Sequence, residues 1–184
     1  MRIFVLLLLA MVSGCSQAHD VSLRLSFDGG GLCSGTSVGR DVILSAAHCF
    51  DKKRLVAING QPAYAMRIIR DGNDHVLVKV TTAFKHWARI GTNPKTGVHV
   101  TFIGNPLGLA KAYREAYVVA VESDQILYDG NSAPGDSGAG LMAGGKVVGV
   151  VTGTKFWRGS DGQQFSLLWS MPLAFTPEQY AEMV

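Results

Sequence analysis

The feature that most limits the fold of this chain is the shortness of its apolar segments, which turn residues interrupt along almost the whole length. Helical periodicity is nearly absent before the C-terminus, and this pattern is typical of an all-β protein. The 22 glycines among 184 residues suit the many tight turns of such a fold. We expect strands or hairpins at residues 21–27, 36–46, 55–58, 64–70, 76–80, 98–103, 117–122, 125–128, 139–142, 147–152 and 164–169.

The distribution of these strands predicts two lobes. A polar segment at residues 92–97 separates two groups of roughly six strands, so we expect two small barrels packed together, over about 20–92 and 97–184. A functional site would then lie in the cleft between them. Thr176 is followed by Pro177 and, three residues after the cap, by Gln179, which predicts one short helix up to about Met183.

The N-terminus has the pattern of an export signal over residues 1–14. A positive charge at Arg2 precedes an apolar run that is too short to span a bilayer. The run ends at Cys15 in a sequence that resembles the lipobox of bacterial lipoproteins, whose cysteine becomes the lipidated first residue. The mature domain then spans 15–184 and is anchored at the periplasmic face of the outer membrane. The alternative is ordinary cleavage after Ala18, which gives a secreted or periplasmic protein.

Charge and cysteine content narrow the choice of partners. The net charge is +3 and the basic residues are scattered, so we expect no nucleic acid partner. Cys15 is either lipidated or cut away, which leaves Cys33 and Cys49. In an exported protein they are expected to form a disulfide, worth on the order of 3 kcal/mol in the chain-entropy model. Two buried free thiols are the alternative.

Three distant segments carry residue types that suit acyl transfer. Ser137, within the turn Gly-Asp-Ser-Gly at residues 135–138, is a candidate nucleophile, and His48 is its candidate base. Asp74 would orient the histidine, because it directly precedes the apolar strand at 76–80 that would fix its position; Asp71 is the rival candidate. The backbone N–H groups of Gly135 and Ser137 are the candidate oxyanion donors.

Several segments match the motifs of one enzyme family, in the same order along the chain. They are residues 33–35 (the cysteine that partners the one beside the histidine), 44–49 (the histidine), 74–79 (the aspartate), 135–138 (the nucleophile) and 148–153 (the substrate-channel strand). Over nearly the whole mature chain the sequence therefore resembles the trypsin/chymotrypsin-like serine peptidases. Residues 103–108 resemble the bacterial HtrA branch, although no PDZ module follows. The resemblance implies two six-stranded Greek-key-type barrels, a His-Asp-Ser triad and peptide or protein substrates.

The chain also departs from that family. It carries no activation-site sequence before Cys33, so we expect the protein to be synthesised in an active form. The Asp136 carboxylate should then accept hydrogen bonds from backbone or side-chain donors. Alternatively, Asp136 is simply a turn residue. By its offset from Ser137, Asn131 occupies the position of the pocket-floor aspartate of trypsin-like enzymes, which argues against a preference for Lys or Arg. Three residues are expected to form the edge against which a peptide pairs: Thr152, Gly153 and Thr154.

The expected function is therefore a serine endopeptidase that needs no cofactor or metal. His75, His86 and His99 have no zinc-site spacing and are expected to be surface or packing residues. An α/β-hydrolase is excluded because its histidine follows the serine, whereas no histidine follows His99 here. The alternative from another class is a catalytically inactive, protease-like binding module or adhesin on the same fold.

Overall fold

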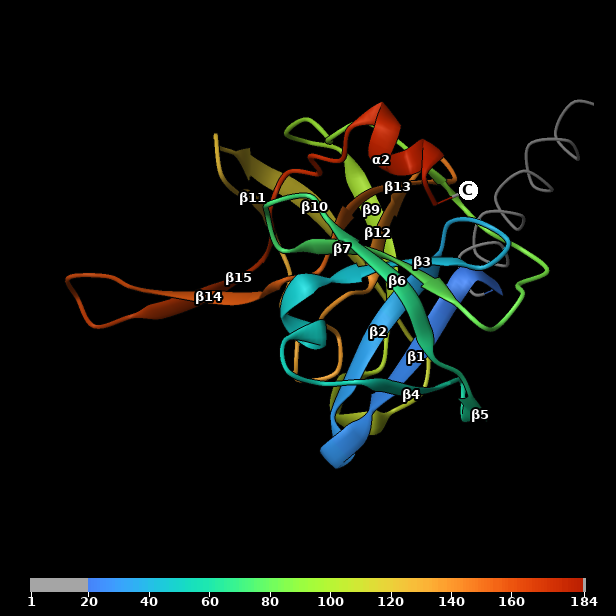
Figure 1. Ribbon diagram of the computed structural model, residues 1–184. Helices are drawn as coiled ribbons and strands as arrows, with labels where there is room; N and C mark the ends of the chain where they lie inside the picture. Colours follow the sequence, from blue (N-terminus) through green and yellow to red (C-terminus); the bar gives the residue numbers. More distant parts are fainter. Residues whose placement is uncertain (1–19, 184) are drawn as a thin grey trace, which may run out of the picture.

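The computed structural model describes residues 20–183, which form two curled, mainly antiparallel β-sheets (Figure 1). In the described part of the chain, the first sheet has seven strands in the order β5-β4-β1-β2-β3-β7-β6. Its strands are β1 (Ser22–Phe27), β2 (Leu32–Ser37), β3 (Val42–Ala46), β4 (Leu55–Ile58), β5 (Gln61–Pro62), β6 (Ala65–Arg70) and β7 (His75–Val80). The two-lobed, all-β fold class expected from the sequence is confirmed.

The second sheet has eight strands between residues 20 and 183, in the order β14-β15-β11-β10-β9-β12-β13-β8. They are β8 (Arg89–Ile90), β9 (His99–Gly104), β10 (Ala112–Val121), β11 (Ile126–Tyr128), β12 (Gly140–Ala143), β13 (Lys146–Val150), β14 (Gly153–Arg158) and β15 (Gln164–Ser170). The sheet therefore includes β8, which precedes the linker and pairs in parallel with β13.

The strand numbers exceed the expected six per lobe because pairing creates strands that lack an apolar pattern of their own. The turn Asn59-Gly60 closes a hairpin, as expected from the positive φ of both residues (52° and 79°). Its return strand β5 has only two residues, because Pro62 has no N–H to donate to a longer ladder. Strand β14, which sequence patterning extended no further than Thr154, continues to Arg158 through its pairing with β15.

Each sheet encloses an apolar core, and the C-terminal helix covers the first one. Helix α2 (Pro177–Ala181) begins with the expected capping box: the Thr176 hydroxyl accepts the Gln179 N–H at 3.3 Å, and the Gln179 side chain accepts the Thr176 N–H at 2.8 Å. The helix ends two residues before the expected limit, and Met183 is fully buried against the core of the first sheet. The C-terminal segment thus crosses back from the second lobe to the first.

Three short 3₁₀ helices complete the described structure: η1 (Asp28–Gly30), η2 (Ala47–Phe50) and η3 (Pro106–Gly108). No helix within residues 20–183 is long and apolar enough to cross a membrane. The expected signal sequence, the Cys15 lipidation site and the alternative cleavage site after Ala18 lie outside the described residues.

Candidate active site

The register between β3 and β7 brings His48 to Asp74. Ala46 at the end of β3 pairs with His75 at the start of β7, so the residues that flank these two strands meet at one edge of the sheet. The chain then turns into η2, where the Ala47 N–H donates to the Asp74 carbonyl oxygen at 3.0 Å. The two candidate residues, 26 positions apart, are therefore held together by sheet pairing.

The Asp74 carboxylate holds His48 at two points. One oxygen accepts the His48 backbone N–H at 2.9 Å, and the other lies 2.8 Å from Nδ1 of the ring. Burial by itself raises the pKa of Asp74, but the hydrogen bonds from the His48 ring and amide outweigh it and leave the pKa below its ordinary value. Because an ionised carboxylate only accepts, Nδ1 carries a proton, and in the neutral ring this tautomer leaves the lone pair on Nε2.

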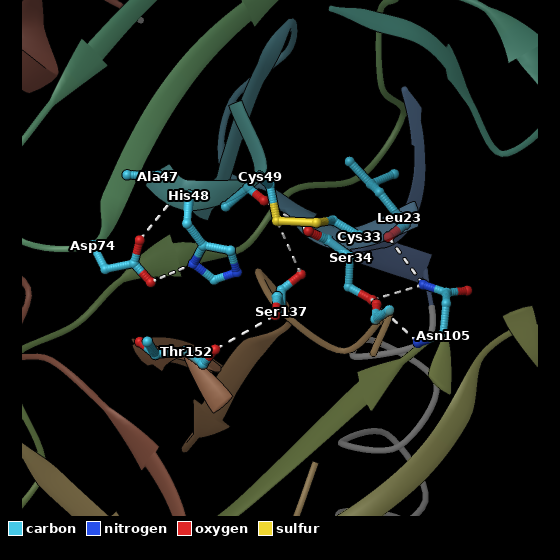
Figure 2. Close-up of a disulfide and its surroundings, with 12 residues drawn as sticks. Leu23, Cys33, Ser34, Ala47, His48, Cys49, Asp74, Asn105, Ser137 and Thr152 are labelled. Atoms are coloured by element: carbon cyan, nitrogen blue, oxygen red, sulfur yellow. Dashed lines mark hydrogen bonds and ion pairs between the residues drawn. A yellow bond between two sulfur atoms is a disulfide. The ribbon is translucent and has the colours of Figure 1, made fainter. Parts of the chain in front are cut away.

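Ser137 lies on the side of the His48 ring opposite Asp74 (Figure 2). Within residues 20–183 its hydroxyl donates to the Thr152 carbonyl oxygen at 3.4 Å rather than to the ring. Rotation about the Cα–Cβ bond is the movement that would turn it toward Nε2. Catalytic hydrogen bonds are often long or misaligned before substrate binds, so this orientation is compatible with a nucleophile.

The turn before Ser137 leaves two backbone donors unused. The Pro134 carbonyl accepts the Leu107 N–H at 2.7 Å, so the N–H of Gly135, on the opposite side of the same trans peptide, points away from Leu107. Across residues 20–183, the N–H groups of Gly135 and Ser137 have no acceptor, whereas that of Asp136 bonds to the Ala133 carbonyl oxygen at 3.0 Å. Two free donors that flank one residue are suited to bind an oxyanion.

Only glycine fits at residue 135. Gly135 has φ of +103°, and a Cβ built there would lie 2.3 Å from the Asn105 carbonyl oxygen. Its carbonyl oxygen accepts the Ser34 hydroxyl at 2.8 Å, and Ser34 Oγ in turn accepts the Asn105 side-chain N–H at 2.9 Å. The Ser34 N–H also donates to the Ser137 carbonyl oxygen at 2.8 Å. A buried polar network between Ser34 of the first lobe and Asn105 of the second therefore fixes the turn that carries Ser137 (Figure 2).

Asp136 is fully buried beside Ser137 and has two donors. Its carboxylate accepts the Ala133 N–H at 2.8 Å and forms an ion pair with the guanidinium of Arg114 in β10. The same guanidinium lies over the Phe102 ring, 4.6 Å from its centroid. The expectation that backbone and side-chain donors satisfy Asp136 is confirmed, and the charge that compensates it comes from within the domain.

Comparison with protein-family models matches residues 33–150, more than half of the chain, to the trypsin-like peptidase domain. The chain belongs to this family. Comparison with curated proteins gave no match.

The expected disulfide of this peptidase domain is present, joining Cys33 in β2 to Cys49 in η2. Cys49 directly follows His48, and its sulfur lies 3.8 Å from the Ser137 carbonyl oxygen. The bridge therefore connects the segment that carries the histidine to the strand that supports the serine turn (Figure 2).

Of the four residues expected to bind substrate, Thr152 contacts Ser137 directly. The carbonyl oxygen of Thr152 contacts the Ser137 hydroxyl, and Gly153 begins the edge strand β14. Thr154 accepts the Ser132 N–H through Oγ1 at 2.7 Å, which joins the strand to the segment before the serine turn. Asn131 is exposed, and its carbonyl oxygen accepts from Arg114 at 3.5 Å.

Asp71, the rival of Asp74, belongs to a separate buried pair. Its carboxylate lies 2.6 Å from Nδ1 of His75, and both side chains are inaccessible to solvent. The same carboxylate accepts the Ala174 N–H at 3.1 Å, so it ties the loop that carries Asp74 to the C-terminal segment. His75 is thus a packing residue, as expected. In the described residues, no cluster of three or more His, Cys, Asp or Glu side chains could hold a metal ion.

Sequence reasoning missed two residues that support the site, Arg114 and Ser34. Arg114 is one charge in a strand of alternating polarity, and no local pattern marks it as the partner of Asp136. Ser34 lies beside the recognised Cys33, but its bonds to Gly135 and Asn105 span 101 and 71 residues. Both roles depend on contacts that are distant along the chain.

Proposed function

We propose that this trypsin-like domain is an active serine endopeptidase that hydrolyses peptide bonds through an acyl-enzyme intermediate. The observation that carries the proposal is the position of His48 between the two other groups, with Nδ1 held by Asp74 and the Ser137 side chain beside its opposite edge. This order of groups is the one that activates a serine hydroxyl.

In the proposed reaction, Ser137 Oγ leaves the Thr152 carbonyl oxygen and attacks the carbonyl carbon of the scissile bond. Nε2 of His48 takes the hydroxyl proton, and Asp74 stabilises the resulting imidazolium. As the C–N bond breaks, the same proton passes to the leaving amine. A water molecule then attacks the acyl-enzyme and gives a proton to His48. As the bond from the acyl carbon to Ser137 Oγ breaks, His48 returns this proton to Oγ, and the carboxylic acid leaves.

The negative charge that forms on the carbonyl oxygen is proposed to bind the N–H groups of Gly135 and Ser137. One such donor is worth roughly 2.7–4 kcal/mol of the barrier. Both donors depend on the orientation of one short turn, which the Ser34 hydroxyl and the Arg114–Asp136 ion pair hold from opposite lobes. Because both supports are internal, we propose that the enzyme is made in its active form.

Substrates of a peptidase domain are peptides or proteins, and we propose that they pair with the strand edge that begins at Thr152. The absence of an acidic side chain at Asn131 argues against a preference for Lys or Arg before the cut. We further propose that the enzyme is exported and anchored to the outer membrane by acylation of Cys15. Incorporation of radiolabelled palmitate that Cys15→Ala abolishes would support the anchor, and an unlabelled, freely soluble wild-type protein would contradict it.

Labelling by a fluorophosphonate probe tests the activity directly. We expect covalent modification of Ser137, which mass spectrometry would locate, and its loss in His48→Ala. His99→Ala is the matched control, because this exposed histidine lies outside the site. A folded wild-type protein that does not react, and cleaves nothing in a peptide library, would instead favour the protease-like binding module.

A further inference from the structure

Strands β14 and β15 form a hairpin that projects from the body of the second lobe (Figure 1). The hairpin begins at Gly153, directly after the residue whose carbonyl oxygen contacts the Ser137 hydroxyl. β14 is the edge strand of its sheet, so one side of it has no strand partner among residues 20–183. The candidate substrate edge therefore continues beyond Thr154 along the projecting arm.

Two hydrogen bonds define which backbone groups face this free edge. The Leu168 N–H donates to the Gly130 carbonyl oxygen, so Leu168 faces away from β14 at the base of the hairpin. At the tip, the Gly159 N–H donates to the Gln163 carbonyl oxygen. Because backbone groups alternate along a strand, both bonds give the same register. Three residues of β14 direct their N–H and C=O groups outward: Thr154, Phe156 and Arg158.

One face of the hairpin carries three aromatic side chains, with Lys155 and Leu167 between the inner one and the outer pair. Close to the site, the indole of Trp169 lies beside Gly153, and the Lys155 ammonium lies over the Trp169 ring, 4.3 Å from its centroid. Further out, Trp157 and Phe165 stack across the strands with centroids 5.4 Å apart. Phe165 remains 56% exposed, so this outer pair offers apolar surface that the domain itself does not cover.

From this arrangement we infer that the hairpin is an extended recognition arm for unfolded polypeptide, which selects apolar or aromatic side chains at the fourth and sixth residues before the scissile bond. The inference rests on the proposed peptidase function. Its occupant is the substrate because the arm is continuous with the edge next to Ser137 and exposes unpaired backbone groups.

The positions follow from strand geometry. An antiparallel peptide whose residue before the cut lies opposite Thr152 places its fourth residue opposite Lys155 and its sixth opposite Trp157. Directly opposed residues project from the same face of a sheet. Both substrate side chains therefore lie on the aromatic face, the fourth beside Lys155 and the Trp169 ring that its ammonium covers, and the sixth beside the stacked pair. The third and fifth residues project from the other face.

Two measurements on the wild-type protein test the inference. Mass spectrometry of a cleaved proteome-derived peptide library gives residue frequencies on both sides of the cut, and we expect enrichment of Phe, Tyr, Leu or Trp at the fourth and sixth residues before it. Three fluorogenic peptides with an identical sequence at the cut are then compared. One has three residues before the cut, and the other two have six, with either Phe or Ser at both the fourth and the sixth residue before it. We expect kcat/KM to be about tenfold higher for the Phe peptide than for the others.

Variants of the arm assign the effect to its aromatic face. In Trp157→Ser combined with Phe165→Ser, the ratio of kcat/KM between the Phe and Ser hexapeptides should fall to near one. Tyr64→Ser removes an aromatic residue that is 60% exposed on the first lobe, and it should keep the wild-type ratio. Circular dichroism checks that the variants remain folded. If the double variant is unfolded, the comparison of the three peptides with the wild-type protein still tests the inference.

The outcomes separate the two proposals. A protein that reacts with fluorophosphonate and cleaves all three peptides equally would overturn the recognition arm and leave the peptidase intact. Enrichment confined to residues after the cut would also overturn it, since the peptide would then run the other way. A protein that neither reacts nor cleaves would contradict the peptidase itself.

Discussion

The Arg114 guanidinium contacts the buried carboxylate of Asp136, the residue directly before Ser137. This ion pair joins β10 to the turn whose N–H groups are the candidate oxyanion donors. It supplies, from inside the domain, a positive charge for a carboxylate that is fully removed from solvent. The conformation of the turn is therefore coupled to the charge of one arginine.

Replacing that arginine should be costly because it leaves Asp136 buried without its cation. We expect Arg114→Met to lower the free energy of unfolding by about 3–5 kcal/mol. Arg54→Met is the matched control, since Arg54 pairs with Asp28 at the surface and is 88% exposed, and exposed pairs contribute about 0–1 kcal/mol. Urea unfolding of both variants gives the comparison. Equal losses would show that the buried pair has no special role.

Asp74 and Asp71 should have separable roles although each contacts a histidine. Asp74→Asn should lower kcat by about 10⁴ with little change in the melting temperature, because it removes the acceptor that selects the His48 tautomer. Asp71→Asn should instead lower the free energy of unfolding by about 1–3 kcal/mol, because an NH₂ group replaces one of the two buried oxygens that accept N–H groups. Kinetics and calorimetry on both variants test this. A larger kcat loss in the Asp71 variant would reverse the assignment.

The Cys33–Cys49 disulfide should contribute to both stability and activity. It joins residues 16 positions apart, which corresponds to a stabilisation of about 3 kcal/mol in the chain-entropy model. Reductant should lower the melting temperature of the wild-type protein and, because Cys49 follows His48, should also reduce turnover. The Cys33→Ala/Cys49→Ala variant should be unaffected by reductant. A reductant effect of the same size in that variant would point to another cause.

The raised pKa of Tyr128 predicts that the free energy of unfolding falls at alkaline pH. Burial raises its pKa to about 12, although the Ser170 hydrogen bond opposes this. The pKa of Tyr128 in the folded protein thus exceeds the unfolded value of about 10. The neutral, buried side chain therefore contributes fully to the free energy of unfolding below about pH 10, and this contribution is lost as the pH rises toward about 12.

Between about pH 10 and pH 12, the free energy of unfolding should fall less in Tyr128→Phe than in the wild-type protein, by on the order of 2 kcal/mol. At pH 7 the variant should be less stable than the wild-type protein by about 1 kcal/mol, because it lacks only the hydrogen bond. Burial also raises the pKa of Tyr180 to about 12, so part of the pH dependence should persist in the variant. Denaturant titrations at several pH values measure the difference. Parallel curves for the two proteins would refute the assignment to Tyr128.

The sequence by itself determined what depends on neighbouring residues. The short apolar segments set the all-β class, the Asn59-Gly60 turn set a hairpin, and the capping residues set the start of the C-terminal helix. The motifs around His48, Asp74 and Ser137 identified the candidate chemistry, because the residues that suit each role are recognisable from a few adjacent positions.

Only the tertiary structure decided which distant groups meet. Sheet register placed Ala46 opposite His75 and so brought His48 to Asp74. Packing within the second lobe brought Arg114 to Asp136, and packing of the two lobes brought Ser34 to Gly135. The extension of β14 into a projecting arm depended on its pairing with β15. The physical reason is that local propensity constrains the backbone of a few residues, whereas the partner of a buried charge or an edge strand is fixed when the whole chain packs.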